Sequence, residues 1–372
     1  MATRKFLVVG GGVGGMSAAI SLRQQGADVE LIDIDPHWRA LGAGMTLSGP
    51  TLRAFDRLGV LEGVRRKGCL SDRTKFFTVD GVFRTEIAAP MLESGLPQVG
   101  GILRPDLHSI LSDRVKALGA RVRLDVSVER LEQDADGVSV AFSDGTHDRF
   151  DVLVGADGFH SSIRAMILPD APKATFTGQG CWRLLADRPS HVTGPEIYFA
   201  EDFKVGVNPC SADKMYLFAN VKMPGNPYVP QDELLPRMRD LLAPIGGTIR
   251  KVREGLSETS AINYRPLEML LVPRPWHVGR VGLIGDAVHA TTPHLASGAG
   301  LSVEAGYLLG EMLVDAEDVD AAWRSFGQRR WERSRLVVEN SVLIGDLEQE
   351  GGNDERIAQI MGASQMALAE PM

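Results

Sequence analysis

The sequence predicts an α/β fold: one domain with a parallel sheet and a β-meander, a smaller domain on an antiparallel sheet, and C-terminal helices. Two observations predict it. Residues 5–9 form a short apolar run that leads through a glycine-rich turn into residues 16–25, which favour a helix, and a parallel sheet typically begins in this way. From about residue 175 to 271 the pattern changes to short strand-like runs, which indicates an antiparallel sheet.

Composition agrees with a globular protein. The chain has 372 residues, of which 44% are hydrophobic and 24% are charged, and this excludes a wholly disordered chain or a coiled coil. The formal net charge of −8 argues against a surface for nucleic acid or an anionic membrane. Glycine is unusually frequent, with 41 residues against a usual share of about 7%. The chain therefore needs many tight turns or close backbone approaches.

The cysteines and apolar segments bear on location. Cys69, Cys181 and Cys210 are too few and too scattered for a disulfide framework or a zinc ribbon, so we expect reduced thiols in a cytoplasmic protein. No apolar stretch reaches the roughly 18 residues of a membrane span. Glycines interrupt the apolar segment 6–20, which otherwise looks like a secretory signal. We predict no membrane partner and no nucleic-acid partner.

The glycine-rich turn after the first strand has the pattern of a dinucleotide-binding fingerprint. Gly10 would make the tight turn, Gly12 would let a pyrophosphate approach, and Gly15 would let the helix pack on the strand, with Gly14 in the same run. The phosphates would lie at the positive amino end of the helix. A second strand closes at Asp33, which is placed to bind a ribose hydroxyl. The fingerprint predicts a Rossmann-like domain without deciding between NAD and FAD.

The middle of the chain supplies the two kinds of sheet. Residues 50–64 read as one amphipathic helix. Residues 122–154 alternate apolar and polar side chains around two Asp-Gly pairs, which predicts a β-meander. The antiparallel sheet is expected to contain residues 74–83, 181–185, 196–199, 204–207, 215–221 and 260–265.

The last quarter of the chain returns to the first sheet. A strand at 280–284 leads towards a helix from about residue 298. Residues 323–345 are helical, and residues 351–372 read as a loosely held tail.

Two further strand ends carry a glycine followed by an acid. In Val-Leu-Val-Gly-Ala-Asp157-Gly the carboxylate lies at a strand end, where open α/β sheets bind ligands; alternatively, Asp157 only caps a turn. The strand at 280–284 ends in Gly285-Asp286, and a glycine-flanked helix follows about a dozen residues later. Taken alone, this second segment is equally consistent with a structural turn.

Together with the fingerprint, these segments resemble the single-component aromatic-ring hydroxylases, the FAD-dependent monooxygenases of the p-hydroxybenzoate hydroxylase and salicylate hydroxylase type. The resemblance covers about residues 5–345 and includes Arg104-Pro-Asp-Leu and Gly-Asp286-Ala-Val-His-Ala-Thr-Thr-Pro293. It implies FAD as cofactor and NADH or NADPH as co-substrate. It also implies hydroxylation of a small phenolic or hydroxylated N-heteroaromatic substrate by dioxygen, through a flavin hydroperoxide.

The resemblance implies roles for individual residues. Asp33 would hold the adenosine ribose, and Arg104 would approach the pyrophosphate region. Asp157 would lie between FAD and the nicotinamide, Asp286 would hold the ribityl chain, and Pro293 would lie near the flavin ring.

The predicted helix start after Pro293 also bears on the cofactor. Backbone amides at Gly298, Ala299 and Gly300 begin a helix whose positive end can stabilise an anionic reduced flavin. The chain departs here from the usual family stretch Gly-Ala-Gly-Ala-Gly, because Leu295-Ala-Ser precedes Gly298.

Residues of the antiparallel sheet are candidates for the substrate pocket. Lys204, Asn208, Tyr216 and Phe218 lie on strands that would roof the flavin. Lys204 could hold an anionic substituent and Tyr216 a phenolic oxygen; the alternative is a solvated lysine and a core tyrosine.

Four other side chains, two near the start of the antiparallel sheet and two histidines close to Pro293, also need an interpretation. Trp182 and Arg183 read as a packing aromatic and a surface charge. His294, next to Pro293, could relay a proton. His289 and His294 lack a third ligand and suitable spacing, so no metal site is expected.

We expect a discontinuous FAD-binding domain, which consists of residues 1–73, 100–174 and 275–330. The substrate domain would consist of residues 74–99 and 175–274, and residues 331–372 would form a C-terminal helix and tail. The protein would be a monomer or a homodimer. Two other interpretations stay open: an FAD-binding redox or partner-binding module without hydroxylase turnover, and an NAD-dependent dehydrogenase.

Overall fold

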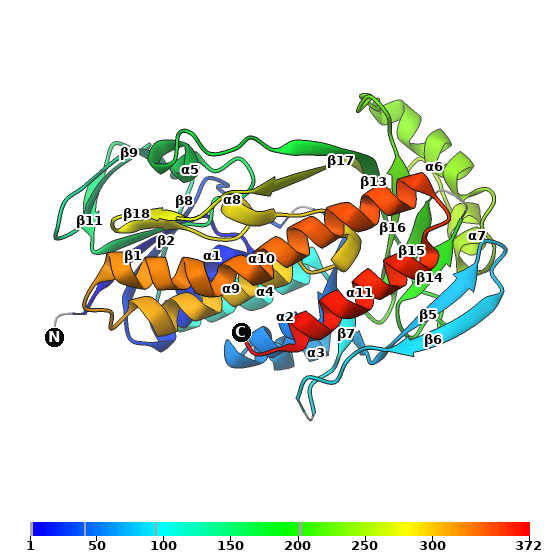
Figure 1. Ribbon diagram of the computed structural model, residues 1–372, viewed down its shortest axis with the longest axis horizontal. Helices are drawn as coiled ribbons and strands as arrows, with labels where there is room; N and C mark the ends of the chain where they lie inside the picture. The colour runs from blue at the N-terminus through cyan, green and yellow to red at the C-terminus, as the bar shows by residue number, and fades with distance from the viewer. Residues whose placement is uncertain (1–2, 41, 94, 201–202) are drawn as a thin grey trace.

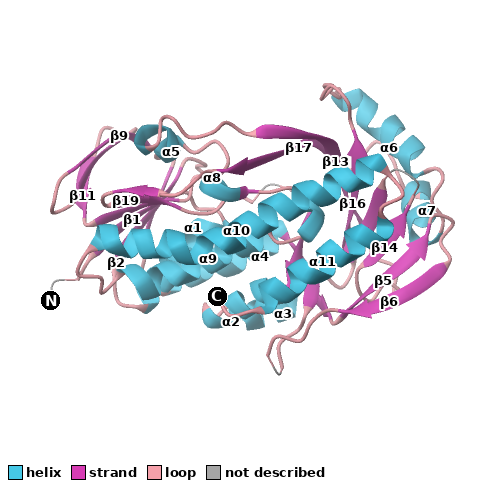
Figure 2. Ribbon diagram, viewed as in Figure 1, coloured by secondary structure: helices cyan, strands magenta, loops and turns pink. Residues whose placement is uncertain are grey.

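The structure, a computed structural model, describes residues 3–40, 42–93, 95–200 and 203–372. Two large sheets lie at opposite ends of the molecule, and long helices run between them (Figure 1). Figure 2 shows the strands of both sheets in magenta. This arrangement confirms an α/β fold with a parallel sheet, antiparallel sheets and C-terminal helices.

The helices of the described residues are α1 (Val13–Gln24), α2 (Gly49–Arg57), α3 (Leu61–Lys67), α4 (Arg104–Ala117), α5 (Ser162–Ile167), α6 (Leu234–Leu242), α7 (Gly247–Glu254), α8 (Asp286–His289), α9 (Gly298–Leu313), α10 (Val319–Glu350) and α11 (Asp354–Ala369), with short 3-10 helices η1 (Gln231–Glu233) and η2 (Pro293–Leu295). The strands are β1 (Lys5–Val9), β2 (Asp28–Asp33), β3 (Gly44–Ser48), β4 (Cys69–Ser71), β5 (Arg73–Thr78), β6 (Phe83–Ala88), β7 (Val99–Leu103), β8 (Arg121–Leu124), β9 (Val128–Gln133), β10 (Val138–Phe142), β11 (His147–Phe150), β12 (Val152–Gly155), β13 (Thr175–Asp187), β14 (Glu196–Phe199), β15 (Lys204–Pro209), β16 (Lys214–Lys222), β17 (Ile262–Leu271), β18 (His277–Val278) and β19 (Val281–Leu283).

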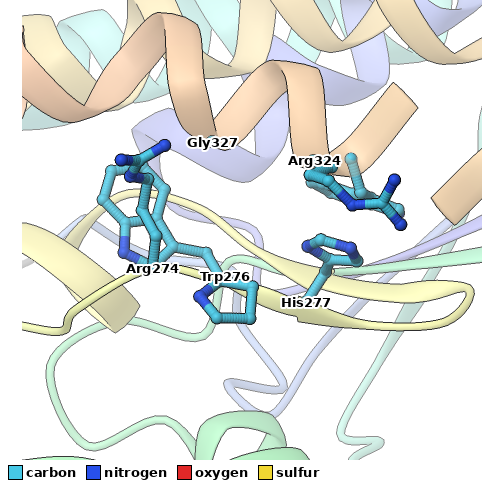
Figure 3. A pocket seen from close by; sticks show the side chains of 7 residues that line it. Arg274, Trp276, His277, Arg324 and Gly327 are labelled. Atoms are coloured by element: carbon cyan, nitrogen blue, oxygen red, sulfur yellow. The ribbon is translucent and has the colours of Figure 1, made fainter. Parts of the chain in front are cut away.

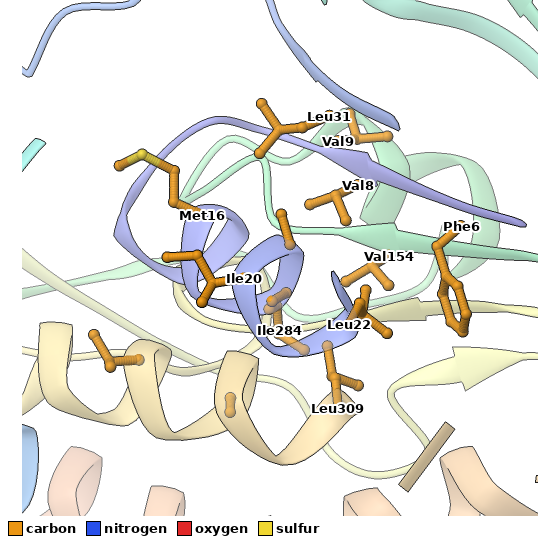
Figure 4. Packing of buried hydrophobic residues seen from close by; sticks show 14 of the residues in the cluster. Phe6, Val8, Val9, Met16, Ile20, Leu22, Leu31, Val154, Ile284 and Leu309 are labelled. Carbon is orange, nitrogen blue, oxygen red and sulfur yellow. The ribbon is translucent and has the colours of Figure 1, made fainter. Parts of the chain in front are cut away.

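The parallel sheet has the strand order β18-β19-β12-β1-β2-β8. All neighbours from β19 to β8 are parallel, and β18 pairs antiparallel with β19. Its inner strands are buried on both faces, which explains why β1 reads as a continuous apolar run. The core beside it contains residues of β1, β12 and α1, with Leu309 of α9 and Ile284 (Figure 4).

The β-meander consists of β9, β10 and β11, which pair antiparallel in sequence order. Both boundaries of the prediction were wrong, because its first and last strands belong to the parallel sheet: residues 121–124 form β8, which pairs in parallel with β2, and residues 152–155 form β12, which pairs in parallel with β1 and β19. A separate small sheet has the order β3-β7-β4.

Helices α1 and α9 pack closely along small residues. A Cβ on Gly306 would lie 2.7 Å from the carbonyl oxygen of Gly14, and a Cβ on Gly310 would lie 2.3 Å from the hydroxyl oxygen of Ser21. Gly14 precedes Ser21 in α1, and their neighbours Gly306 and Gly310 follow in the same order in α9, so the two helices are parallel. Their amino-terminal ends therefore lie at the same end of the pair.

The antiparallel sheet has the order β17-β13-β16-β15-β14-β5-β6, in which only β14 and β5 are parallel neighbours. One face is apolar and packs with side chains of α6 and α7. Trp182 lies on this face and is 3% exposed, as predicted. The register places Cys181, Asn220 and Lys204 side by side on the other face. Arg183, two residues after Cys181, lies on that polar face as well.

Two expectations about this sheet were wrong. Residues 74–83 are not one strand, because the chain turns at Gly81, with φ +88°, and returns as β6. Helices α6 and α7 occupy part of the stretch read as strands. Met238 and Leu242 of α6 lie on its buried face, one helical turn apart.

Two helical predictions also need correction. The helix expected at 50–64 is divided into α2 and α3 at Gly59, whose φ of +71° an α-helix does not accommodate. The tail expected at 351–372 instead forms α11. Arg53 donates hydrogen bonds to the carbonyl oxygens of Ala369 and Glu370, at 2.9 and 2.7 Å.

Candidate active site

The carboxyl ends of the parallel strands gather the predicted cofactor residues. Gly10 follows β1, Asp33 ends β2, Asp157 follows β12, and Asp286 follows β19 after two intervening residues. Parallel strands end at a common edge, so these residues lie along one side of the sheet. The structure thus brings together the four strand ends that the sequence singled out.

The glycines of the first turn fall into two kinds. Gly10 has φ +105°, and a Cβ on Gly15 would lie 1.9 Å from the carbonyl oxygen of Gly10. These two are required by the protein itself. Gly12, in contrast, has an extended conformation with φ −73°, and a Cβ there would meet nothing within 4 Å. A glycine at position 12 therefore keeps open the space at the start of α1, which fits a phosphate group.

The carboxylates of Asp33 and Asp157 already have partners in the protein. Asp33 accepts hydrogen bonds from the backbone amides of Gly11 and Asp35, at 2.6 and 2.7 Å. Asp157 accepts from the amides of Ser162 and Ile163 at the start of α5, at 2.7 and 3.1 Å. Asp157 thus satisfies the first two amides of α5, whose N-cap residue is Ser161, and this agrees with the structural interpretation of Asp157.

Trp38 completes the first turn and was not predicted. Its indole nitrogen donates to the carbonyl oxygen of Gly11 at 3.0 Å, and the side chain is 7% exposed. A Cβ on Gly11 would lie 2.1 Å from that nitrogen, so the close contact depends on glycine.

Arg104, Asp286, Tyr216 and Arg183 form an electrostatically coupled group. The positive charge of Arg104 interacts with the carboxylate of Asp286 and with the like charge of Arg183, and Tyr216 belongs to the group as a neutral phenol. Asp286 has a large accessible area, yet dense surroundings raise the pKa of its carboxyl group, while Arg104 acts to lower it. Arg104 is similarly accessible, and burial among protein atoms lowers the pKa of its guanidinium. Both side chains are thus accessible to solvent and at the same time surrounded by many protein atoms.

Arg183 and Tyr216 extend this group into the antiparallel sheet. Tyr216 is 7% exposed, and burial raises the pKa of its hydroxyl group well above the usual value. The expectation of Arg183 as a surface charge was wrong. Its side chain is partly buried on the polar face of the sheet, and its Nε atom has no hydrogen-bond partner among the described residues.

A buried charged cluster lies farther along the same face. Lys204 forms an ion pair with Glu348 of α10, and the Nε2 atom of His294 lies 3.2 Å from the other carboxylate oxygen. That second contact is close without hydrogen-bond geometry. Burial acts to raise the pKa of Glu348, but chiefly the positive charge of Lys204 lowers it, to about 2. Burial lowers the pKa of His294, so Glu348 is anionic beside a neutral imidazole at neutral pH.

The turn that carries His294 leads into α9. Pro293 begins η2, and the Nδ1 atom of His294 lies 2.9 Å from the hydroxyl oxygen of Thr292. Helix α9 then begins at Gly298 without a side-chain cap. Its first amides, at 298–300, are thus available to a ligand, near the amino end of α1.

The described part of the chain also has a hollow that lies away from the predicted site residues. A hollow of about 390 Å³ between β18 and α10 is lined by none of the predicted site residues but by Arg274, Pro275, Trp276, His277, Trp323, Arg324 and Gly327 (Figure 3). In the described part of the chain, no three side chains of His, Cys, Asp or Glu gather as a metal site would require. None of its helices combines the length and apolarity that crossing a membrane requires.

Comparisons with known proteins identify the family. The family described as "FAD binding domain" matches residues 3–341. YetM of Bacillus subtilis, assigned as an FAD-dependent monooxygenase, is 30% identical over 360 residues, which cover 96% of this chain and 97% of YetM. The FAD-dependent urate hydroxylase of Klebsiella pneumoniae is 28% identical over 343 residues, covering 90% of this chain and 88% of that enzyme.

A solved structure agrees with this assignment. Klebsiella pneumoniae HpxO in complex with FAD and uric acid has a TM-score of 0.82 and 26% identity, with 99% of this chain and 93% of that chain covered. These matches remove the NAD-dependent dehydrogenase interpretation. The chain therefore belongs to the FAD-binding-domain family, as a single-component FAD-dependent monooxygenase of the aromatic hydroxylase type.

Proposed function

We propose that FAD lies along the carboxyl edge of the parallel sheet, with its pyrophosphate at the amino end of α1. The observation that carries this placement is Gly12, which neither backbone conformation nor protein packing requires to be glycine. Gly10, Gly14 and Gly15 shape the same turn. Arg104 would contribute positive charge towards the pyrophosphate.

The remaining cofactor contacts follow from the strand ends. Asp33 would accept from the adenosine ribose with the lone pairs that its backbone contacts leave free. Asp286 has an accessible carboxylate and would hold the ribityl chain. Asp157 would lie where a nicotinamide co-substrate, NADH or NADPH, approaches. The amides of Gly298, Ala299 and Gly300 would face the flavin ring and stabilise negative charge on it.

The substrate would bind between the flavin and the polar face of the antiparallel sheet. In this proposal Tyr216, Lys204, Pro293 and His294 would border the substrate. When bound, FAD supplies the redox chemistry, taking a hydride from the nicotinamide and activating dioxygen. The chain's own residues orient the ring, exclude water and hold hydrogen bonds to its oxygen atoms.

We propose a small phenol or hydroxylated N-heteroaromatic as the substrate. The urate hydroxylase relative supports an N-heteroaromatic ring, because its substrate is one. A ring that carries its own oxygen substituent is electron-rich, so it needs little help from a general base. Only the neutral His294 and the buried Tyr216 are candidates for proton transfer here.

Several wider expectations stay with this proposal. The FAD-binding domain would comprise residues 1–73, 100–174 and 275–330, and the substrate domain residues 74–99 and 175–274. The protein would act in the cytoplasm, which its three free cysteines support. It would be a monomer or a homodimer.

A panel of phenols and hydroxylated N-heteroaromatics, incubated with NADH or NADPH and dioxygen labelled with oxygen-18, tests the function. We expect one product heavier by a single labelled oxygen atom. A product without label would contradict a monooxygenase. NAD(P)H oxidation that no panel compound stimulates, with FAD fully bound, would instead favour a redox module without hydroxylase turnover.

A further inference from the structure

The polar face of the antiparallel sheet carries two cations that could meet a substrate. Lys204 lies on β15 opposite Asn220 of β16, and Asn220 lies opposite Cys181 of β13. Arg183 is two residues farther along β13, so its side chain points to the same face. Both cations border the space proposed for the substrate, but their environments differ.

Lys204 is already neutralised by a residue from a distant part of the chain. Its ammonium group pairs with Glu348, and the two side chains are 11% and 9% exposed. The end of α10 comes this close because position 345 is glycine: a Cβ there would lie 2.6 Å from Gln179 Oε1 and 3.0 Å from His294 Cε1. Gln349 adds a hydrogen bond from α10 to the carbonyl oxygen of Thr177, at 3.1 Å.

Arg183 has no such counter-ion. No carboxylate of the described residues lies within ion-pair distance of its guanidinium, and its Nε atom has no hydrogen-bond partner among them. Its side-chain partners are Tyr216 and Cys181, and burial raises the pKa of both, so both are neutral groups at neutral pH. The positive charge of Arg183 is therefore not neutralised by an anion of the described residues, which favours an anionic or strongly polar ligand beside it.

We propose that Glu348 is a positioning residue that withholds Lys204 from the substrate, and that Arg183 is the cation that meets a phenolate, carboxylate or ring oxygen of an aromatic substrate. The proposal rests on the proposed function for the location of the pocket. Glu348 acts through Lys204 and does not touch the substrate. The specificity for an anionic ring then depends on β13, and the C-terminal helix tunes it.

The test compares two probes of the same shape, 4-hydroxybenzoate and the uncharged 4-hydroxybenzamide. Each is titrated into the FAD-loaded protein, and the change in flavin absorbance gives its dissociation constant. Arg183→Met should weaken the binding of 4-hydroxybenzoate by about 10-fold or more relative to that of the amide, because one charge-assisted hydrogen bond is lost. Glu348→Gln should strengthen 4-hydroxybenzoate relative to the amide by a similar factor, because Lys204 becomes free to bind it.

Two control variants show whether a changed ratio of the dissociation constants comes from the loss of the named charge or from a general disturbance of the fold. Asp346→Asn removes an exposed carboxylate from the same turn of α10, and Arg250→Met removes an exposed arginine from α7, which packs on the opposite face of the sheet. Neither should change the ratio of the two dissociation constants. If Glu348→Gln does not fold, Lys204→Met with Glu348→Gln removes the pair without leaving a lone buried charge, and it should keep the wild-type ratio.

Three results would overturn the inference: an Arg183→Met ratio equal to wild type, a Glu348→Gln ratio that does not favour the anion, or a double variant that has lost the preference for the anion. Failure of wild type and of Glu348→Gln to bind 4-hydroxybenzoate at millimolar concentration would count equally against it. The proposed function fails separately, if the probes behave as expected while no panel compound is hydroxylated.

Discussion

Gly12→Ala should separate folding from FAD binding. The wild-type backbone at position 12 is extended, with φ −73°, and a Cβ would meet no protein atom within 4 Å. Alanine can therefore take this conformation, and the free energy of unfolding should fall by about 1 kcal/mol or less, the difference between glycine and alanine at a helix N-cap. A methyl group would nevertheless lie where we place the pyrophosphate.

The size of the binding defect follows from the contacts that the methyl group would displace. One charge-assisted hydrogen bond between a backbone amide and a phosphate contributes about 1.5–3 kcal/mol, or roughly 10- to 150-fold in affinity. Gly12→Val adds two more carbon atoms at the same point and should bind still less FAD. Gly15→Ala should behave oppositely, since its Cβ would lie 1.9 Å from the carbonyl oxygen of Gly10. That variant should lose its fold together with its flavin.

The assay is a titration of FAD into apoprotein, followed by flavin fluorescence, beside urea unfolding of the same apoprotein. Gly362→Ala is the control, because it also adds a methyl group into open space, on the exposed side of α11. Wild-type FAD affinity in Gly12→Val would refute the placement of the pyrophosphate. A large loss of apoprotein stability in Gly12→Ala would refute the structural reasoning.

Four further outcomes are expected. Asp286→Ala should weaken FAD by roughly 10- to 150-fold, through loss of a charge-assisted hydrogen bond to the ribityl chain; unchanged affinity in a fluorescence titration would contradict this role. Tyr216→Ala should leave flavin reduction largely intact while more of the consumed NAD(P)H appears as hydrogen peroxide, and an unchanged ratio of product to peroxide would place Tyr216 outside the pocket. Glu304→Gln should lower the free energy of unfolding by about 3–5 kcal/mol, because Arg330 and Arg333 lose their buried counter-ion. The control is the exposed Glu332→Gln. An equal loss of stability in that variant would contradict the claim that burial makes the ion pairs of Glu304 important. The pKa of Glu348 is lowered from 4.5 to about 2, so its contribution to the free energy of unfolding is complete above about pH 4.5 and is lost as the pH falls towards 2. Between pH 6 and 3 the free energy of unfolding should therefore fall more steeply for wild type than for Glu348→Gln. Parallel curves for the two proteins would contradict the pKa shift.

The cofactor half of the site could be predicted because its information is local. In an open parallel sheet the ligand lies beyond the strand ends, so a buried run followed by glycine and an acid marks the position without knowledge of the fold. Gly10, Asp157 and Asp286 were found in this way and lie along one edge. Their individual contacts with FAD stay predictions.

The substrate half could not be predicted because its contacts join distant segments. Alternation along β13 indicates that Trp182 and Arg183 face opposite ways, but it does not tell which face meets the rest of the protein. Glu348 pairs with a lysine 144 residues earlier in the chain, and no spacing in the sequence marks such a pair. Helix α6 did leave a signal, in Leu234, Met238 and Leu242 at intervals of four, within a stretch otherwise typical of strands.

The position of Glu348 also has a consequence for the order in which the molecule is completed during synthesis. Every residue assigned to the dinucleotide site has left the ribosome once residue 300 has emerged, and the strands that carry Lys204 and Arg183 precede it. The carboxylate that pairs with Lys204 arrives only with the last turn of α10. During synthesis Lys204 therefore lacks its counter-ion until nearly all of α10 has emerged, after the last of the residues proposed to bind FAD. If Glu348 withholds Lys204 as proposed, the selectivity for the ring substrate would be set by a segment outside the residues proposed for the cofactor site.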